Sequence, residues 1–505
     1  MGKLANNVDG LPLRIPKRPF WTLAGALLTL TAIAAAAVCA SIGFRYTASI
    51  GFRYTQHRGT APSKFYANVT QPRGICAGVR GDAASYAGYI GLAGDAEDTP
   101  RRSFFWLFEA EEDARDAPVI LTVGGGPGTT GLSRPVSGQG PCSLTANGTV
   151  PNPDRVTEKY NVLALDHPIG TGFSYGRMVN NSRDGALDVY DFLQKFYVLF
   201  PHLAKNPLVI SGGSYGGKHV PNIATVIQEQ NRALASDSTS SAVHINLESL
   251  MISNPTSDPM AHFRWLLYFY CELHSVYDAP TCAAMYAKLP ACLDLIELSL
   301  QDAGLSERAS SARRAAREAC LYIAWGGDTH GVMVEDVRRR CDEEDTMECF
   351  PLFKWLEQYF RDPVTTRALG IPPFINFTAL SGPVDEAFAA TGDEMIPTHQ
   401  LYEPLLTDGI RVLHYIGAQD GNCAWPGVFS FLTRLRTPFQ REFLGAPDVP
   451  WPTADSDAAT VRAVGAGAGN MTYMLISGSG HFPQQEQSAL VKDITERWIE
   501  NRAWF

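Results

Sequence analysis

Six short apolar runs alternate with helix-like stretches along the chain. They cover residues 117–123, 162–165, 208–210, 250–252, 412–416 and 474–476. Continuous apolar strands separated by helices are typical of a parallel sheet that is covered on both faces. Hydrophobic residues make up 45% of the 505-residue chain, which is ordinary for a globular protein. We therefore expect an α/β fold with a mostly parallel central sheet.

The stretch between residues 258 and 406 has a different character. It carries six of the ten cysteines, and its pattern predicts helices at residues 313–320, 334–340 and 352–360. We interpret residues 259–406 as a helical, disulfide-rich insertion that forms a cap over the carboxyl edge of the sheet. Ligands of open α/β sheets bind at that edge, so a cap there would shape the substrate pocket.

A glycine-rich turn follows the apolar run at residues 208–210. Residues 212–216 are Gly-Gly-Ser-Tyr-Gly, and the pattern becomes helical from His219 onward. The turn fits G-x-S-x-G, in which small flanking residues leave room for a nucleophilic serine on a strained strand-to-helix turn. Such a motif arises by chance in a chain with 45 glycines, but its position between strand and helix favours Ser214 as a nucleophile.

Two further residues complete a candidate catalytic triad. A serine hydroxyl is a poor nucleophile unless a histidine accepts its proton and a carboxylate orients that histidine. In this type of fold the order along the chain is Ser, Asp, His. Asp420 follows the apolar run 412–416, and His481 follows the run 474–476. Alone, they could be a turn aspartate and a surface histidine; together they predict a triad of Ser214, Asp420 and His481.

Acyl transfer also needs two backbone N–H groups that stabilise the developing oxyanion. We expect one from Tyr215, directly after the nucleophile, and the other from Gly126 in the glycine-rich segment 124–128. The alternatives for this segment are a plain turn or a phosphate-binding loop. No Lys-Ser/Thr pair follows it, which excludes a P-loop.

Charge and motif content argue against several other functions. The chain has 42 Lys and Arg against 52 Asp and Glu, a net charge of −10, whereas nucleic-acid binding relies on clustered basic residues. It contains no C-x-x-C or H-E-x-x-H motif. We therefore expect no nucleic-acid partner, no metal and no other cofactor.

The N-terminal region predicts a membrane anchor. The apolar segment at residues 20–44 has no acidic or basic side chain and is long enough, as a helix, to cross a hydrocarbon core of ~30 Å. Basic residues precede this segment. We expect a cytosolic tail at 1–18, a transmembrane segment at 19–44, a stem at 45–75 and a catalytic domain at 76–505 on the lumenal or extracellular side. The alternative is a cleaved signal peptide, with residues 38–40 as the cleavage site and a secreted or vacuolar product.

N-x-S/T sequons after the anchor agree with a lumenal destination. We expect glycosylation at Asn68, Asn147, Asn180, Asn376 and Asn470. Nine of the ten cysteines also follow the apolar segment, which suits an oxidising compartment.

Beyond these motifs, the chain resembles the serine carboxypeptidases, particularly their fungal branch. The resemblance runs from about Ser85 to the C-terminus and includes residues 85–89, 104–110, 125–128, 140–142, 166–175, 212–221, 254–259, 337–341 and 498. It implies an α/β-hydrolase fold with the triad and oxyanion donors named above. It also implies an unpaired Cys423 near the active site and the disulfides Cys76–Cys142, Cys271–Cys282, Cys292–Cys320 and Cys341–Cys349.

Three positions depart from the family pattern. The family binds the terminal carboxylate of its substrate with an asparagine and two glutamates, where this chain has Gly124, Gln139 and Gly213. Gln139 can still donate a hydrogen bond, but two charge-assisted bonds at ~1.5–3 kcal/mol each are lost. Arg134 lies in the loop before Gln139. It is either a replacement cation or a solvated loop arginine, and the sequence favours the second.

Three hypotheses for the function follow. The first is a serine carboxypeptidase that releases C-terminal residues from peptides through an acyl-enzyme on Ser214. The second is an esterase or acyltransferase with the same triad, because the carboxylate-binding residues are replaced. The third is a membrane-tethered binding protein without catalysis, against which the intact triad argues. The expected partners are a peptide or acyl-ester substrate and, through the anchor, a membrane; the oligomeric state stays open.

Overall fold

The computed structural model describes residues 65–76, 84–237, 239–302, 304–341, 349–452 and 456–505. The predicted tail at 1–18 and anchor at 19–44 lie outside the described residues, as does most of the predicted stem. Among the helices in the described ranges, none combines the length and apolar character needed to span a bilayer.

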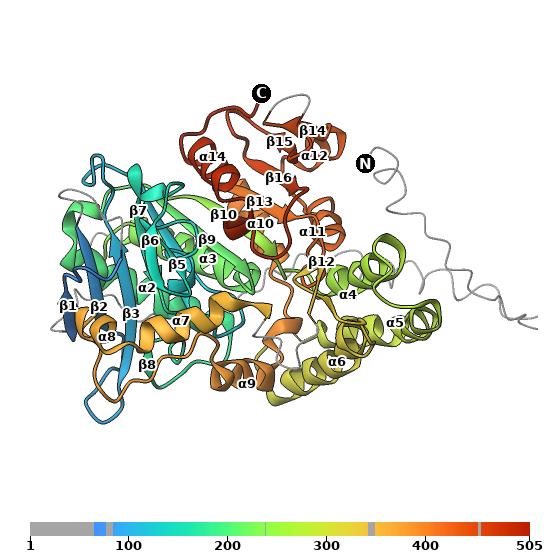
Figure 1. Ribbon diagram of the computed structural model, residues 1–505, viewed down its shortest axis with the longest axis horizontal. Coiled ribbons are helices and arrows are strands. Elements are labelled where there is room, and N and C mark those ends of the chain that lie inside the picture. Colours follow the sequence, from blue (N-terminus) through green and yellow to red (C-terminus); the bar gives the residue numbers. More distant parts are fainter. Residues whose placement is uncertain (1–64, 77–83, 238, 303, 342–348, 453–455) are drawn as a thin grey trace, which may run out of the picture. The chain divides into compact units, whose positions relative to one another are not determined.

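One large sheet dominates the fold (Figure 1). Its central strands are mutually parallel and follow the order β7 (Asn161–Leu165), β4 (Val119–Val123), β9 (Leu208–Ser214), β10 (Leu247–Pro255), β13 (Arg411–Gly417) and β16 (Met471–Ile476). All six predicted apolar runs fall on these strands, so the predicted parallel sheet is confirmed.

Antiparallel strands extend both edges of this parallel centre. One edge carries β3 (Arg101–Phe108), β2 (Ser85–Gly91), β1 (Ala67–Thr70) and the short β8 (Tyr175–Gly176). The other carries β15 (Ala459–Val464) and β14 (Val449–Trp451). A separate hairpin consists of β5 (Cys142–Thr145) and β6 (Gly148–Pro151).

Helices pack on both faces of the sheet. Val209 of β9 shares a core with Val491 and Trp498 of α14 (Ser488–Ile499). Gly212 of the same strand lies against Val220 of α3 (Gly216–Ser236). Because side chains alternate between the faces of a strand, α14 and α3 cover opposite faces. The remaining α-helices outside the insertion, among the residues that the structure describes, are α2 (Ser182–Leu199), α11 (Trp425–Leu432), α12 (Gln440–Gly445) and α13 (Pro483–Glu486).

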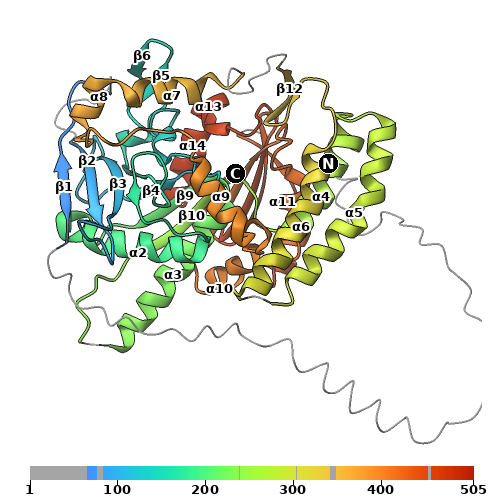
Figure 2. The same cartoon turned by 90° about the horizontal axis from the view of Figure 1, so that it is seen from below.

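The segment between β10 and β13 forms two groups of helices (Figures 1 and 2). The first comprises α4 (Pro259–Tyr268), a π-helical turn (Phe269–Leu273), α5 (Ala279–Ser299) and α6 (Glu307–Trp325), which share one apolar core. The second comprises α7 (Pro351–Arg361) and α8 (Pro363–Ala368), beside the β1–β3 edge, with Phe360 packed on Trp106. The helices α9 (Gly382–Thr391) and α10 (Tyr402–Thr407) follow them.

The predicted helix at residues 334–340 is wrong. The chain there forms a hairpin of β11 (Val332–Met333) and β12 (Asp336–Arg340). The carboxylate of Asp336 accepts bonds from the backbone N–H and the guanidinium of Arg338, and the strand then enters the disulfide at Cys341. These contacts, together with pairing to β11, outweigh the local helical preference.

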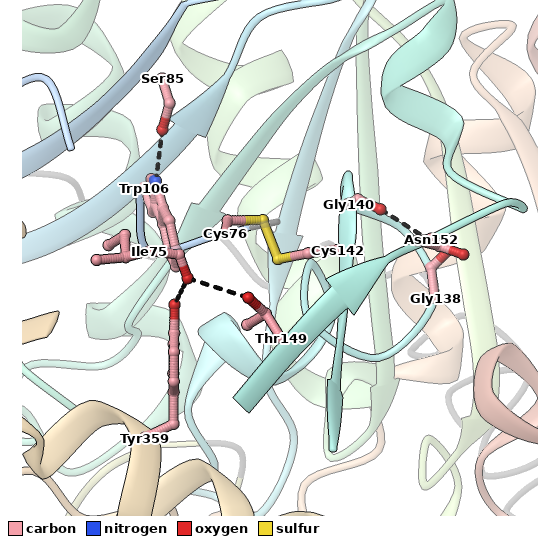
Figure 3. The surroundings of a disulfide bond; sticks show 10 residues. All are labelled: Ile75, Cys76, Ser85, Trp106, Gly138, Gly140, Cys142, Thr149, Asn152 and Tyr359. Carbon is pink, nitrogen blue, oxygen red and sulfur yellow. Dashed lines mark hydrogen bonds between the residues drawn. A yellow bond between two sulfur atoms is a disulfide. The ribbon is translucent and has the colours of Figure 1, made fainter. Parts of the chain in front are cut away.

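Four disulfides join the cysteine pairs that the resemblance implies: Cys76–Cys142, Cys271–Cys282, Cys292–Cys320 and Cys341–Cys349. The first ties the segment before β2 to β5 (Figure 3). Beside it, the Ile75 carbonyl accepts hydrogen bonds from Thr149 and from Tyr359 of α7. The disulfide therefore anchors the loop that contains Gln139 to the body of the domain.

Candidate active site

The nucleophile candidate lies where the strand β9 meets the helix α3. Ser214 ends β9 with φ of +58°, a left-handed conformation that is rare for a residue with a side chain. A Cβ on Gly217 would lie 2.6 Å from Pro255, so the turn requires a small residue there. The backbone thus has the strained geometry of a nucleophile elbow.

Asp420 and His481 are in direct contact. His481 Nδ1 lies 2.8 Å from Asp420 Oδ2, and both side chains are buried. The other carboxylate oxygen, Oδ1, accepts from the backbone N–H groups of Asn422 at 2.8 Å and Cys423 at 3.0 Å. Asn254 Nδ2 donates to Oδ2 at 2.6 Å. These four contacts hold the carboxylate in one orientation beneath the imidazole.

Ser214 and His481 meet at a shared neighbour, the unpaired and buried Cys423. Its thiol interacts with both the His481 imidazole and the Ser214 hydroxyl, while burial raises the pKa of that thiol. Burial lowers the pKa of His481, but the Asp420 carboxylate and its hydrogen bond outweigh this and raise it well above the ordinary value. An imidazolium is therefore strongly stabilised at this position.

The same cluster has the composition of a metal site. The ligand atoms of Asp420, Cys423 and His481 lie within 4.8 Å of one another. However, the carboxylate oxygens of Asp420 already accept four hydrogen bonds, one of them shared with His481. The geometry therefore fits an Asp–His pair beside a serine better than it fits three free ligands.

The oxyanion-hole candidates lie next to Ser214. Gly126, Ser214 and Tyr215 line the same pocket. A Cβ on Gly125 would lie 3.2 Å from the backbone nitrogen of Tyr215, so the glycine-rich segment packs closely on the elbow. Tyr215 is held from its other end, because its hydroxyl donates to Asp393 Oδ2 at 2.7 Å.

That pocket has a volume of about 230 Å³ and is walled by the insertion. Its apolar lining includes Phe263 and Leu266 of α4, Trp325 of α6 and Phe388 of α9. Its charged lining consists of Asp385, Arg317 and Glu394, of which the last two form an ion pair at 2.9 Å. The helices between β10 and β13 thus form most of the pocket wall above the nucleophile.

Comparison with known proteins places this site in a family. A family model described as "Serine carboxypeptidase" matches residues 78–501. The chain belongs to the serine carboxypeptidase family. Two similar relatives are the carboxypeptidase Y homologs A of Arthroderma otae and Arthroderma gypseum, each 30% identical over 433 residues, or 84% of this chain and 75% of the relative.

A solved structure supports the fold. The chain aligns with a prohormone-processing carboxypeptidase of Saccharomyces cerevisiae, Kex1(delta)p, with a TM-score of 0.69 at 20% identity. The alignment covers 83% of this chain and 92% of that structure. The protein is therefore a serine carboxypeptidase-like hydrolase with an α/β-hydrolase fold.

The predicted carboxylate-binding positions of this family member are occupied in an unexpected way. Gly124 directly follows β4, and it lies against the backbone of Thr129. Gln139 is buried, and its Oε1 has no hydrogen-bond partner among the described residues. At Gly213 the missing side chain is replaced by the guanidinium of Arg134. The interpretation of Arg134 as a solvated loop residue is wrong, because its exposed fraction is only 5%.

The sequence analysis missed three residues around the carboxypeptidase site. Asn254 donates a hydrogen bond to Asp420, and Asp393 accepts one from the Tyr215 hydroxyl. The backbone carbonyl of Glu335 accepts a hydrogen bond from the backbone N–H of His481 at 2.7 Å. Asn254 lies at the carboxyl end of β10, the same kind of position that identified Asp420 and His481, so this signal was available. The other two come from the insertion, where the sequence has no comparable strand.

The predicted glycosylation residues differ in accessibility. Asn470 is half-buried. The remaining four are exposed: Asn68, Asn147, Asn180 and Asn376. The four exposed positions are sterically open to a glycan, whereas Asn470 is less so.

Proposed function

We propose that this protein is a serine carboxypeptidase that releases C-terminal residues from peptides through an acyl-enzyme on Ser214. The observation that carries the proposal is the buried contact of 2.8 Å between His481 Nδ1 and Asp420 Oδ2, beside a serine in a nucleophile elbow. Membership of the serine carboxypeptidase family supports a peptide as the substrate.

The chemistry follows from these positions. His481 Nε2 accepts the proton of the Ser214 hydroxyl as the oxygen attacks the scissile carbonyl, and Asp420 keeps Nδ1 protonated and the ring oriented. The N–H groups of Gly126 and Tyr215 stabilise the oxyanion. The imidazolium then donates its proton to the leaving amino group. In the second half-reaction His481 accepts a proton from the water that attacks the acyl carbonyl, and it returns this proton to the Ser214 oxygen as that oxygen leaves.

The second candidate function is ester hydrolysis or acyl transfer with the same residues. Its support is the loss of side chains at Gly124 and Gly213, together with a neutral Gln139. An enzyme that does not select a free carboxylate would accept esters and amides as well as acids.

Kinetics with three matched substrates separate these functions. An N-blocked dipeptide, its C-terminal amide and an aryl ester of the same acyl group would be compared from pH 4 to 8, with Ser214→Ala as the control. If the protein is a carboxypeptidase, we expect kcat/KM to be higher for the free acid than for the amide. Equal rates for acid and amide with rapid ester cleavage would favour the second function. Failure of a fluorophosphonate to label Ser214 would contradict both.

A further inference from the structure

A buried arginine, Arg134, lies beside Ser214 and has no anionic partner among the residues that the structure describes. Arg134 has an exposed fraction of 5%, and its Nη2 donates to Ser253 Oγ at 3.2 Å. Its Nη1 is buried and has no hydrogen-bond partner in the part of the chain that the structure describes. A guanidinium is charged at every physiological pH, and burial of an unpaired charge costs several kcal/mol. This position therefore favours an anion that the described residues do not supply.

The guanidinium occupies the space next to the residue before Ser214. A Cβ on Gly213 would lie 2.3 Å from Arg134 Nη2 and 2.5 Å from Ser253 Oγ. Gly213 and Ser253 are neighbours in the paired strands β9 and β10. The absence of a side chain at Gly213 is thus what allows the cation to reach the end of the nucleophile strand.

The loop that carries Arg134 also contains a second unpartnered polar group. The backbone N–H of Gln139 donates to the Arg134 carbonyl at 3.2 Å, and Gln139 Oε1 lacks a partner. Asn152 Nδ2 bonds the carbonyls of Gly138 and Gly140 at 3.0 and 2.8 Å, on either side of Gln139 (Figure 3). This clamp and the Cys76–Cys142 disulfide hold the loop in place, so the two side chains are positioned before any ligand binds.

We propose that Arg134 binds the terminal carboxylate of the substrate. A planar guanidinium forms paired hydrogen bonds with a carboxylate, and such charge-assisted bonds are about twice as strong as neutral ones. The inference rests on the proposed peptidase function and adds the residue that selects a free C-terminus in this chain.

A dependence on pH follows from this choice of side chain. A peptide carboxylate is ionised above about pH 5, and arginine stays protonated throughout the range of enzyme assays. The attraction between the two therefore does not require an acidic medium. We expect the preference of the wild-type enzyme for free acid over amide to be constant from pH 5 to 8.

The kinetic test compares Arg134→Gln and Arg134→Lys with the wild type. For Arg134→Gln we expect the ratio of kcat/KM for acid over amide to fall about 10- to 100-fold, mainly through KM. Arg134→Lys keeps the charge but not the fork, so its ratio should fall less. The matched control is Arg232→Gln, which removes an exposed arginine paired with Asp408 and should leave the ratio unchanged. An unchanged ratio in Arg134→Gln, or equal losses for both substrates, would overturn the inference.

A second route tests the same group without changing it. Gly213→Ala places a methyl group against Nη2 and must displace the guanidinium. Gly213→Ala should lower the acid-to-amide ratio, as Arg134→Gln does. This result remains informative even if Arg134→Gln folds poorly. Circular dichroism and thermal melting of each variant check the fold. A full acid preference in well-folded Gly213→Ala would contradict the proposed position of the carboxylate.

A binding measurement separates this inference from the proposed function. Calorimetric titration of Ser214→Ala with the blocked dipeptide acid and its amide requires no turnover. We expect the acid to bind at least about tenfold more tightly, and Ser214→Ala/Arg134→Gln to bind both alike. Tight acid binding in a protein that cleaves nothing would refute the proposed function but retain the inference. Cleavage of the peptide without a preference for the acid, in binding or in kinetics, would refute the inference but retain a peptidase function.

Discussion

Asn254 is predicted to hold the catalytic carboxylate in place. Its Nδ2 lies 2.6 Å from Asp420 Oδ2, the oxygen that also contacts His481, and the side chain is fully buried. Its φ of +43° is a conformation that asparagine tolerates and alanine does not. The Asn254 Oδ1 also accepts from the backbone N–H of Gly417 at 3.3 Å. Asn254→Ala therefore removes a hydrogen bond to a charged group and a neutral one, and it adds backbone strain.

The magnitude follows from these three losses. A hydrogen bond to a charged group contributes about 1.5–3 kcal/mol, a neutral one about 0.5–1.5 kcal/mol, and a left-handed alanine costs about 1 kcal/mol. We expect the free energy of unfolding to fall by about 3–5.5 kcal/mol. If the whole hydrogen bond to Asp420 also acts in the transition state, kcat falls about 10- to 150-fold at 1.36 kcal/mol per factor of ten.

Asn231 offers a matched control. Its amide makes two hydrogen bonds, of 2.8 and 3.0 Å, to the backbone of Ile245, and it is also buried. Asn231→Ala should lower stability by about 1–3 kcal/mol through those two bonds while kcat stays near that of the wild type. Urea unfolding and ester kinetics on both variants provide the comparison. A kcat for Asn254→Ala within threefold of the control would show that the backbone N–H groups alone suffice to hold Asp420.

Three further predictions concern charge and cross-links. Burial raises the pKa of Asp166 to about 7, so the stability that its proton contributes is complete below about pH 4 and is lost as pH rises through 7; urea unfolding of Asp166→Asn should therefore show a flatter pH dependence than the wild type, and an equal slope would contradict this. The Glu335 charge interacts with His481, so Glu335→Gln should lower the pKa of His481 and move the acid limb of the kcat/KM profile to lower pH; no movement, or a movement to higher pH, would count against this. The Cys76–Cys142 cross-link spans 66 residues. Changing both cysteines to serine should lower the melting temperature and reduce the free energy of unfolding by about 4 kcal/mol, because the unfolded chain gains entropy. A denaturant midpoint equal to that of the wild type would argue that the loop is held by Asn152 and its neighbours instead.

The glycine-rich elbow and the strands around it were predictable because their signals are local. Each apolar run has the composition of a buried strand, and Ser214, Asp420 and His481 each follow such a run directly. In a parallel sheet the carboxyl ends of strands lie at one edge, so local positions alone bring these residues to one place. The sequence analysis was wrong for residues 334–340, where pairing with β11 decides the conformation.

The environment of Arg134 depended on tertiary structure alone. Composition and loop position predict a solvated arginine, since charged loop residues are mostly exposed. Its burial results from a missing side chain at Gly213, which is far away in sequence and becomes a neighbour only when the loop folds onto β9. The sequence by itself thus determined the sheet and the positions of Ser214, Asp420 and His481 through short-range patterns. Where the Arg134 guanidinium lies was decided by packing between distant segments, because the space available to a side chain is a property of its neighbours.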